Sequence, residues 1–222
     1  MCFNLHVEWR GNFWEYVMKD FDVIHRAYLN KADIKSIILK DALICFSEHG
    51  IESTTIEIIK KKSEISVGSI YHHFKNKEGI IASLIFIALD DLNRYMEHYL
   101  LQATNFERSI AAIVLSYVDW VDEHPLFAEV LFSGKFYVFH SQYKQELEQK
   151  KLNTKKLIIN WFSTPEYKSR LNSIPLDLIL SLIFGITEHY CKNWVLGRVD
   201  NRPKYFRREL ALSAWKAVEL YF

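Results

Sequence analysis

Residues that interrupt helices are scarce in this sequence, and long apolar runs are missing. Only 7 glycines and 4 prolines occur among 222 residues, and both residue types are costly in the interior of a helix. No sustained alternation of apolar and polar residues predicts a strand. No apolar run approaches the roughly 18 residues that a membrane span requires, and the first residues lack a basic-then-apolar leader pattern. We therefore expect a helical, cytoplasmic protein with no membrane partner.

Cysteine content and net charge are also low. Cys2, Cys45 and Cys191 form an odd, unclustered set, which argues against a disulfide framework and lacks the spacing of zinc ligands. The formal net charge is only +1, so the chain as a whole lacks the basic bias that would support nucleic-acid binding. Between residues 54 and 77, however, five lysines stand against two glutamates. By charge alone, this local excess could be an ordinary solvated face.

What the sequence has in abundance is apolar residues at helical spacing. They make up 50% of the chain and recur at intervals of three and four residues. Prolines at positions 125, 165, 175 and 203 mark later helix starts, with Thr164 as an N-cap before Pro165. In the first clear helix the apolar stripe comprises Ile34, Ile37, Ile38, Ala42, Cys45 and Phe46. The pattern predicts helices at about 32–49, 54–62, 66–74, 77–101, 106–123, 126–132, 135–162, 176–196 and 204–222.

The predicted fold class is all-α, in three parts. Residues 1–31 form an N-terminal extension without a clear period: either a helical arm that packs on the next domain or, before Met18, sequence that is not translated. Residues 32–80 are predicted to form a three-helix domain with a helix-turn-helix, and residues 81–222 a helical bundle. The helix from Lys77 to Leu101 spans this boundary, so it could transmit movement.

The segment from Gly50 to Glu78 predicts two short helices joined by a tight turn. Thr54 and Glu57 have capping-box spacing at the start of the first helix, and Ser66 is suited to cap the second. The start of the second helix is small or polar, as expected of a helix that reads base edges. Polar groups at its far end, and at the start of the preceding helix, suit phosphate contacts. The candidate DNA contacts are Thr55, Ser66, Val67, Gly68, Ser69, Tyr71, His72 and Lys77.

Several of these residues carry a family resemblance over about residues 34–84. They are Ala42, Phe46, Gly50, Thr54, Thr55, Ile65, Ser66, Gly68 to Phe74, and Lys75 to Glu78. This pattern resembles the DNA-binding domain of the tetracycline-repressor (TetR) family of bacterial regulators. The resemblance implies that Tyr71 and Lys77 grip the DNA backbone and that Thr55 anchors its helix. It also implies that the major groove is faced by Val67, Gly68, Ser69 and His72.

Two residues depart from the family pattern. Glu64 stands in the turn where glycine is common, and Lys60 stands where a small residue usually packs. The first departure bears on how sharp the turn is, and the second on how the helix before it sits against its neighbours.

The resemblance further implies that the C-terminal bundle binds an effector and forms a homodimer. The helix at 176–196 is apolar nearly all round, and the C-terminal helix carries a second apolar stripe. Together they are expected to form a two-fold, four-helix interface; alternatively, both simply close the core of one chain. The candidate effector-binding residues, each also explicable as core packing, are Tyr117, Trp120, Phe136, Tyr137, His140, Glu188, His189 and Trp194.

The expected function is transcriptional regulation, with repression as what the resemblance implies. A homodimer would bind a palindromic operator in double-stranded DNA and leave it when a small hydrophobic or aromatic effector binds. The alternatives are a protein-interaction module, or an enzyme, whose helix-turn-helix does not bind DNA. The sequence contains no HExxH, GxGxxG, GKS or GKT motif and no convincing nucleophile elbow, so neither enzymatic activity nor a cofactor or metal is expected.

Overall fold

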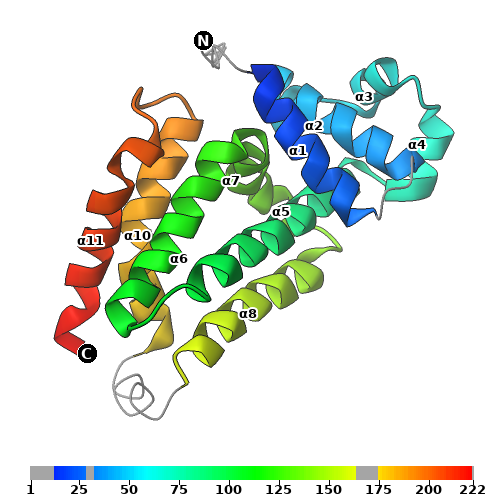
Figure 1. Cartoon of the computed structure of the whole chain (residues 1–222). Coiled ribbons are helices and arrows are strands. Elements are labelled where there is room, and N and C mark those ends of the chain that lie inside the picture. Colours follow the sequence, from blue (N-terminus) through cyan, green and yellow to red (C-terminus); the bar gives the residue numbers. More distant parts are fainter. Residues whose placement is uncertain (1–12, 29–32, 164–174, 222) are drawn as a thin grey trace. The chain divides into compact units, whose positions relative to one another are not determined.

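The computed structural model describes residues 13–28, 33–163 and 175–221. Every regular element in these ranges is a helix, as the sequence predicted (Figure 1). None of these described helices is both long and apolar enough to cross a membrane. The predicted cap at Thr164 and Pro165 lies outside the described residues. The elements are α1 (Phe13–Ala27), α2 (Ile34–Ser53), α3 (Ile56–Ser63), α4 (Val67–Phe74), α5 (Lys77–Leu100), α6 (Phe106–Glu123), α7 (Pro125–Phe139), α8 (Lys144–Trp161), α10 (Leu176–Val195), η1 (Pro203–Phe206), α11 (Arg207–Val218) and η2 (Glu219–Tyr221).

Contacts divide the chain into two compact units. Unit 1 comprises residues 1–91 and 123–150, and unit 2 comprises residues 92–122 and 151–222. The sequence predicted that the helix-turn-helix domain ends at residue 80. The contacts instead extend unit 1 to residue 91 and add residues 123–150, which include α7. Helices α5, α6 and α8 each continue from one unit into the other.

The first helix of the helix-turn-helix domain, α2, is kinked near its end. Gly50 has φ 77° and ψ 156°, and helical turns continue beyond it to Ser53. The prediction that the helix ends at His49 is therefore too short by one turn. Most of the predicted stripe is buried, but Ile34 and Ile37 are 41% and 37% exposed.

The start of α3 differs from the predicted capping box. Thr55, not Thr54, is the N-cap, and its hydroxyl accepts a hydrogen bond from the Ile58 amide at 3.3 Å. Thr54 is fully buried and donates instead to the carbonyls of Cys45 and Gly50, at 3.0 and 2.8 Å. Carbonyl groups at a helix end lack partners within the helix. The Thr54 hydroxyl, which the sequence pattern assigned to the start of α3, therefore bonds to the end of α2 instead.

Helix α7 is longer than predicted, and the break before α8 lies elsewhere. The sequence put the break at residues 133–134, but α7 runs through to Phe139 and the break falls at residues 140–143. Gly134 does not end the helix. A Cβ at this position would lie 2.8 Å from Ile81, 3.2 Å from Ile85 and 3.4 Å from Ile51, so glycine allows α7 to pack closely within unit 1.

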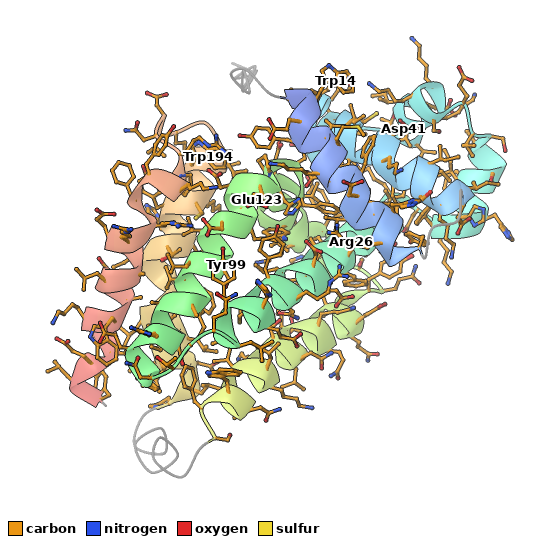
Figure 2. The ribbon with its side chains drawn as sticks, viewed as in Figure 1. Trp14, Arg26, Asp41, Tyr99, Glu123 and Trp194 are labelled. Carbon is orange, nitrogen blue, oxygen red and sulfur yellow. The ribbon has the colours of Figure 1, made fainter. Side chains whose placement is uncertain are left out.

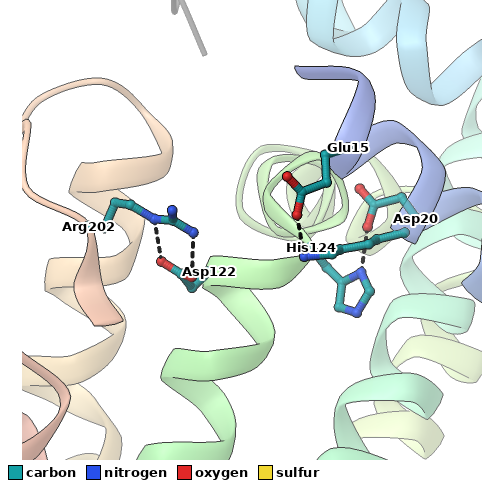
Figure 3. Close-up of polar contacts among 6 residues, drawn as sticks. Glu15, Asp20, Asp122, His124 and Arg202 are labelled. Carbon is teal, nitrogen blue, oxygen red and sulfur yellow. Dashed lines mark hydrogen bonds and ion pairs between the residues drawn. The ribbon is translucent and has the colours of Figure 1, made fainter. Parts of the chain in front are cut away.

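The N-terminal helix α1 packs on α2 and α7. Its buried face includes Val17, Val23 and Ile24, each fully shielded from solvent. This face also buries Asp20, whose carboxylate lies 2.7 Å from Nδ1 of His124 (Figure 3). Burial raises the pKa of Asp20 to about 6, although the hydrogen bond with His124 opposes the rise. Helix α1 is therefore an integral part of unit 1, joined to the start of α7 by a buried polar contact.

Unit 2 contains two buried carboxylates, one turn apart on α6. Arg202 donates to both oxygens of Asp122, at 2.9 and 2.6 Å (Figure 3). Asp119 accepts from Arg207 at 2.6 Å and from the Tyr99 hydroxyl at 2.7 Å. Because an unpaired buried charge is strongly destabilising, these arginines hold the segment leading into α11 against α6.

Candidate nucleic-acid interface

The turn between α3 and α4 is tight despite its non-glycine residue. Glu64 adopts the left-handed conformation, with φ 57° and ψ 12°, and its amide donates to the Lys60 carbonyl at 2.9 Å. The Ser63 hydroxyl accepts from the Ile65 amide at 3.3 Å. A residue with a Cβ pays about 1–2 kcal/mol in this conformation. The geometry usually associated with glycine is therefore kept, at a local energetic cost.

Serine and threonine N-caps leave hydroxyl donors at the starts of both short helices. Ser66 accepts from the Ser69 amide at 3.2 Å, as predicted, and Thr55 caps α3 in the same way. Each hydroxyl uses one of its acceptor positions in the cap and keeps its proton for another partner. Both residues are exposed. Phosphate oxygens bind well at such helix starts, because the backbone amides and the helix dipole attract anions.

Helix α4 has one buried face and one open face. Ile70 and Phe74, at 1% and 4% exposure, anchor it in unit 1. Of the six predicted DNA contacts at residues 66–72, four are exposed and two are half-buried. A Cβ added at Gly68 would meet nothing within 4 Å, so a nucleic-acid backbone or base could approach this position closely. The exposed four are Ser66, Gly68, Tyr71 and His72, and the half-buried two are Val67 and Ser69.

Lys77 has a different environment from the other candidates. Its ammonium group donates to the carbonyls of Ile51, Glu52 and Thr54, at 2.9, 3.2 and 3.0 Å. An ammonium group has three protons, so these contacts account for all of its donors. Lys77 is half-buried and neutralises the carbonyl end of α2 beside the DNA-facing helices.

The lysines on α3 form mostly surface contacts. Lys60 pairs with Glu57 at 3.3 Å and Lys62 with Glu48 at 3.2 Å. Lys60 is exposed, so it does not occupy the packed position of the small residue common in the family. Lys61 and Lys75 are also exposed. This part of the surface is solvated. Its positive charge attracts phosphate groups over a distance.

Two tyrosines outside the motif also contact the helix-turn-helix. The ring of Tyr137, on α7, lies 5.9 Å from the Lys77 ammonium. The hydroxyl of Tyr143, between α7 and α8, donates to the Phe74 carbonyl at 3.2 Å. Local sequence patterns missed the second contact because its partners are 69 residues apart.

The predicted effector-binding residues fall in both units. Phe136, Tyr137 and His140 belong to unit 1, where the Phe136 and His140 rings are 4.3 Å apart and both are exposed. The candidates on α6 and α10 belong to unit 2: Tyr117, Trp120, Glu188, His189 and Trp194.

Within unit 2, Tyr117 and Trp120 are buried on α6. Trp194, which Figure 2 labels on α10, is buried as well. Burial raises the pKa of Tyr117 well above its usual value, and Glu188 adds to the rise. Glu188 is half-buried, and His189 is exposed with its ring 2.9 Å from the Asn193 side chain.

Two buried polar atoms in unit 2 are unsatisfied. Among the described residues, the Thr187 hydroxyl and one oxygen of Asp119 are buried without a hydrogen-bond partner. Buried polar groups normally have partners, so these atoms are suited to meet a polar group of a bound molecule. In the same parts of the chain, no group of histidine, cysteine, aspartate or glutamate side chains is arranged to hold a metal ion.

These features define a helix-turn-helix domain followed by a helical bundle. Residues 38–84 match the family model described as "Bacterial regulatory proteins, tetR family". This part of the chain is therefore similar to the DNA-binding domain of TetR-family regulators.

Relatives agree in sequence over the N-terminal part and in fold over most of the chain. The transcriptional repressor KstR2 from Rhodococcus jostii is 27% identical over 92 residues, which are 41% of this chain and 45% of that protein. The chain spans about half the length of the curated relatives it matches.

Two solved structures show the similarity in fold. The ketosteroid regulator KstR2 from Mycobacterium tuberculosis is 17% identical, with 84% of this chain and 95% of that chain covered and a TM-score of 0.63. FadR from Bacillus subtilis in complex with stearoyl-CoA is 20% identical, with 80% and 96% covered and a TM-score of 0.61.

Proposed function

We propose that the protein is a repressor that binds a palindromic operator as a homodimer and releases it when a small apolar effector binds. The observation that carries the DNA-binding part is the open face of α4, which is held in place by Ile70 and Phe74. A short helix anchored on one side and polar at its exposed start has the form that enters the major groove.

The candidate residues fall into two classes of contact. The hydroxyls of Thr55 and Tyr71 are suited to phosphate oxygens, which set the position of the protein on DNA. Ser69 and His72 are suited to base edges, which carry the sequence information. Lys77 adds positive charge near the phosphates while its protons hold the end of α2.

The dimer part of the proposal is supported by exposed apolar residues on α10 and α11, which pack side by side (Figure 1). Leu178 and Ile186 on α10 are 45% and 56% exposed, and Leu212 on α11 is 56% exposed. On α10, a Cβ added at Gly185 would meet nothing within 4 Å, so another helix can approach closely there. Several exposed apolar residues on neighbouring helices are typical of an interface, and a two-fold dimer fits a palindromic site.

The effector part is supported by the interior of unit 2. Aromatic side chains of α6 and α10 meet there, with the rings of Tyr117 and Phe184 5.7 Å apart. The unsatisfied atoms of Asp119 and Thr187 would favour a largely apolar molecule that carries a hydroxyl or amide group. The regulators of similar fold are named for ketosteroids in one case and contain stearoyl-CoA in the other, which agrees with an apolar effector. Such a molecule lowers DNA affinity to the extent that it prefers another conformation of the dimer.

The test is footprinting of the purified protein on the DNA upstream of its own gene, over a series of salt concentrations. We expect protection of a palindrome, with affinity falling steeply as salt rises, because phosphate contacts release counterions. Equal binding to any DNA, or none, would contradict the proposal and favour the protein-interaction alternative.

A matched pair of variants separates DNA contact from general effects. Tyr71→Phe removes one exposed hydroxyl from α4 and is expected to weaken binding to all sequences about fivefold, as loss of one hydrogen bond would. Tyr205→Phe makes the same change at another exposed tyrosine, in η1, and should leave DNA binding unchanged.

A further inference from the structure

The recognition helix α4 ends in an unusual turn. Lys75 has φ 64° and ψ −44°, and the Asn76 amide donates to the Phe74 carbonyl at 2.7 Å. A hydrogen bond between residues two apart, around a residue with positive φ and negative ψ, defines a γ-turn of the rare, strained kind. Lys75 is not glycine, so the surrounding structure must hold this conformation.

Tyr143 supplies a second hydrogen bond at the same carbonyl. Its hydroxyl donates to the Phe74 carbonyl at 3.2 Å, so both lone pairs of that oxygen have a partner. The contact requires Gly79: a Cβ there would overlap the Phe74 carbonyl and lie 2.6 Å from the Tyr143 hydroxyl. The end of α4, the start of α5 and Tyr143 thus meet at one crowded point of unit 1.

The backbone of Tyr143 is itself fixed to the end of α7. The Ser141 hydroxyl accepts from the Tyr143 amide at 3.2 Å and donates to the Val138 carbonyl at 2.8 Å. Helix α7 is packed against α2, closely enough to require Gly134. The Tyr143 side chain therefore connects a rigidly packed helix to the end of the helix that faces DNA.

We propose that Tyr143 is a positioning residue for DNA reading: from the end of α7, its hydroxyl fixes the C-terminal end of α4 through the Phe74 carbonyl. The inference rests on the proposed function, because it assigns Tyr143 a role in how α4 meets the operator. Tyr143 acts through α4 and needs no contact with DNA.

The experiment compares Tyr143→Phe with Tyr205→Phe in the full chain. Both variants lose one hydroxyl and keep the ring, but Tyr205 is exposed in η1, which belongs to unit 2. Two quantities are measured: hydrogen exchange of the α4 amides without DNA, and affinity for the footprinted operator relative to unrelated DNA. Thermal unfolding midpoints show whether each variant is folded.

We expect Tyr143→Phe to accelerate exchange at the amides of Lys75 and Asn76 and to lower operator affinity about fivefold, as loss of one hydrogen bond would. Affinity for unrelated DNA should not change, because that binding depends on charge. Tyr205→Phe should leave both quantities as in the natural protein. If Tyr143→Phe unfolds the chain, Tyr143→Trp, which keeps a ring but moves its donor, replaces it in the same two measurements.

Unchanged exchange in α4 would overturn the proposal, as would faster exchange with unchanged operator affinity. An equal loss of affinity for operator and unrelated DNA would also overturn it, since positioning must affect sequence reading. Failure of the natural protein to bind any operator would refute the proposed function and the DNA-reading role with it. The exchange rates would still decide separately whether Tyr143 holds the end of α4.

Discussion

At the scale of single residues, Glu64 is a local source of instability in the turn that shapes the DNA-binding motif. Its φ of 57° is a conformation that glycine adopts without steric cost. We expect Glu64→Gly to raise the free energy of unfolding by roughly 0.5–1 kcal/mol, the relief of left-handed strain less the entropy that glycine adds to the unfolded chain. Urea denaturation measures the change.

Lys61→Gly is the control for this substitution. Lys61 lies one turn earlier, within α3 and away from any positive φ, so glycine there should lower stability by about 1 kcal/mol. A loss of stability in both variants would show that Glu64 is not strained.

Lys77 gives a second prediction at this scale. Its ammonium group holds three carbonyls at and beyond the end of α2, so Lys77→Met should destabilise the protein even without DNA. The expected loss is about 1 kcal/mol, toward the low end for charged hydrogen bonds because the group is half-exposed. Chemical denaturation of the DNA-free protein provides the measurement, with exposed Lys61→Met as the comparison.

If Lys77→Met matched the natural protein in stability but bound DNA less well, the lysine would act on phosphate alone, as the family resemblance implied. Loss of stability in the Lys61→Met protein to the same extent would show instead that any lysine on this surface has the effect.

The residues around the helix-turn-helix show what sequence can and cannot predict at this scale. Ser66 caps its helix as predicted, at 3.2 Å from the capped amide, because a cap is a local interaction over three residues. Asn76 makes the same kind of cap at the start of α5, at 2.9 Å. Thr55 caps α3 in place of Thr54, because Thr54 bonds to carbonyls of α2, up to nine residues away. Local spacing cannot resolve such competition between two neighbouring hydroxyls.

At the scale of helices, α7 shows the same contrast. Its start at Pro125 was correctly predicted, since proline suits the first turn. Its end was wrong because the sequence put a break at residues 133–134, whereas Gly134 lies within the helix and is the contact point with Ile81 and Ile85. In a sequence, a glycine can mark either the end of a helix or a close contact within it. Which of the two applies at Gly134 depends on its packing partners, some 50 residues earlier in the chain.

The contact of α7 with α2 predicts a pH dependence. Glu129 on α7 is hydrogen-bonded to Ser47 on α2, and burial raises the pKa of Glu129 to about 7 from an ordinary 4.5. The folded protein therefore holds this proton up to a higher pH than the unfolded chain does. This contribution to stability falls as pH rises from about 4.5 to about 7, and it stays low above that range.

Glu129→Gln removes the ionisation and keeps an acceptor for Ser47. Its stability relative to the natural protein should rise with pH across that window and reach a plateau above about pH 7, in favour of the variant. Denaturant unfolding at intervals from pH 4 to 8 measures the difference. Glu146→Gln, at an exposed site on α8, is the matched control and should show no such trend.

A constant difference between Glu129→Gln and the natural protein at every pH would contradict the raised pKa. A difference that changed in the opposite direction, with the variant favoured only at low pH, would place the charged form of Glu129 among the stabilising groups.

At the scale of the whole molecule, the all-α class followed from composition and periodicity, because few glycines and prolines and regular apolar spacing are properties of the chain itself. The assignment of α7 to the unit of the helix-turn-helix did not follow. It depends on close contacts between distant segments, such as Gly134 with Ile81. For the same reason, sequence grouped Phe136 and Tyr137 with Tyr117, whereas the contacts assign them to different units.

The apolar nature of α10 on almost all sides was the sequence signal for a partner, and the exposed residues on α10 and α11 agree with it. If these residues form a two-fold interface, each substitution acts twice, once from each copy. Ile186→Glu would then bury two like charges and should raise the dimer dissociation constant by at least about 100-fold. Ile186 is 56% exposed in the single chain, so the monomer should remain folded.

Sedimentation velocity over a range of protein concentrations measures the effect, with circular dichroism to confirm folding. Leu101→Glu is the control, because Leu101 is 75% exposed but follows α5 and lies on neither α10 nor α11. We expect the natural protein and Leu101→Glu to dimerise alike, and Ile186→Glu to sediment as a monomer and to lose cooperative protection of both operator half-sites. A dimer that persists in Ile186→Glu would show that its interface lies elsewhere, and the exposed apolar residues of α10 would then need a different partner.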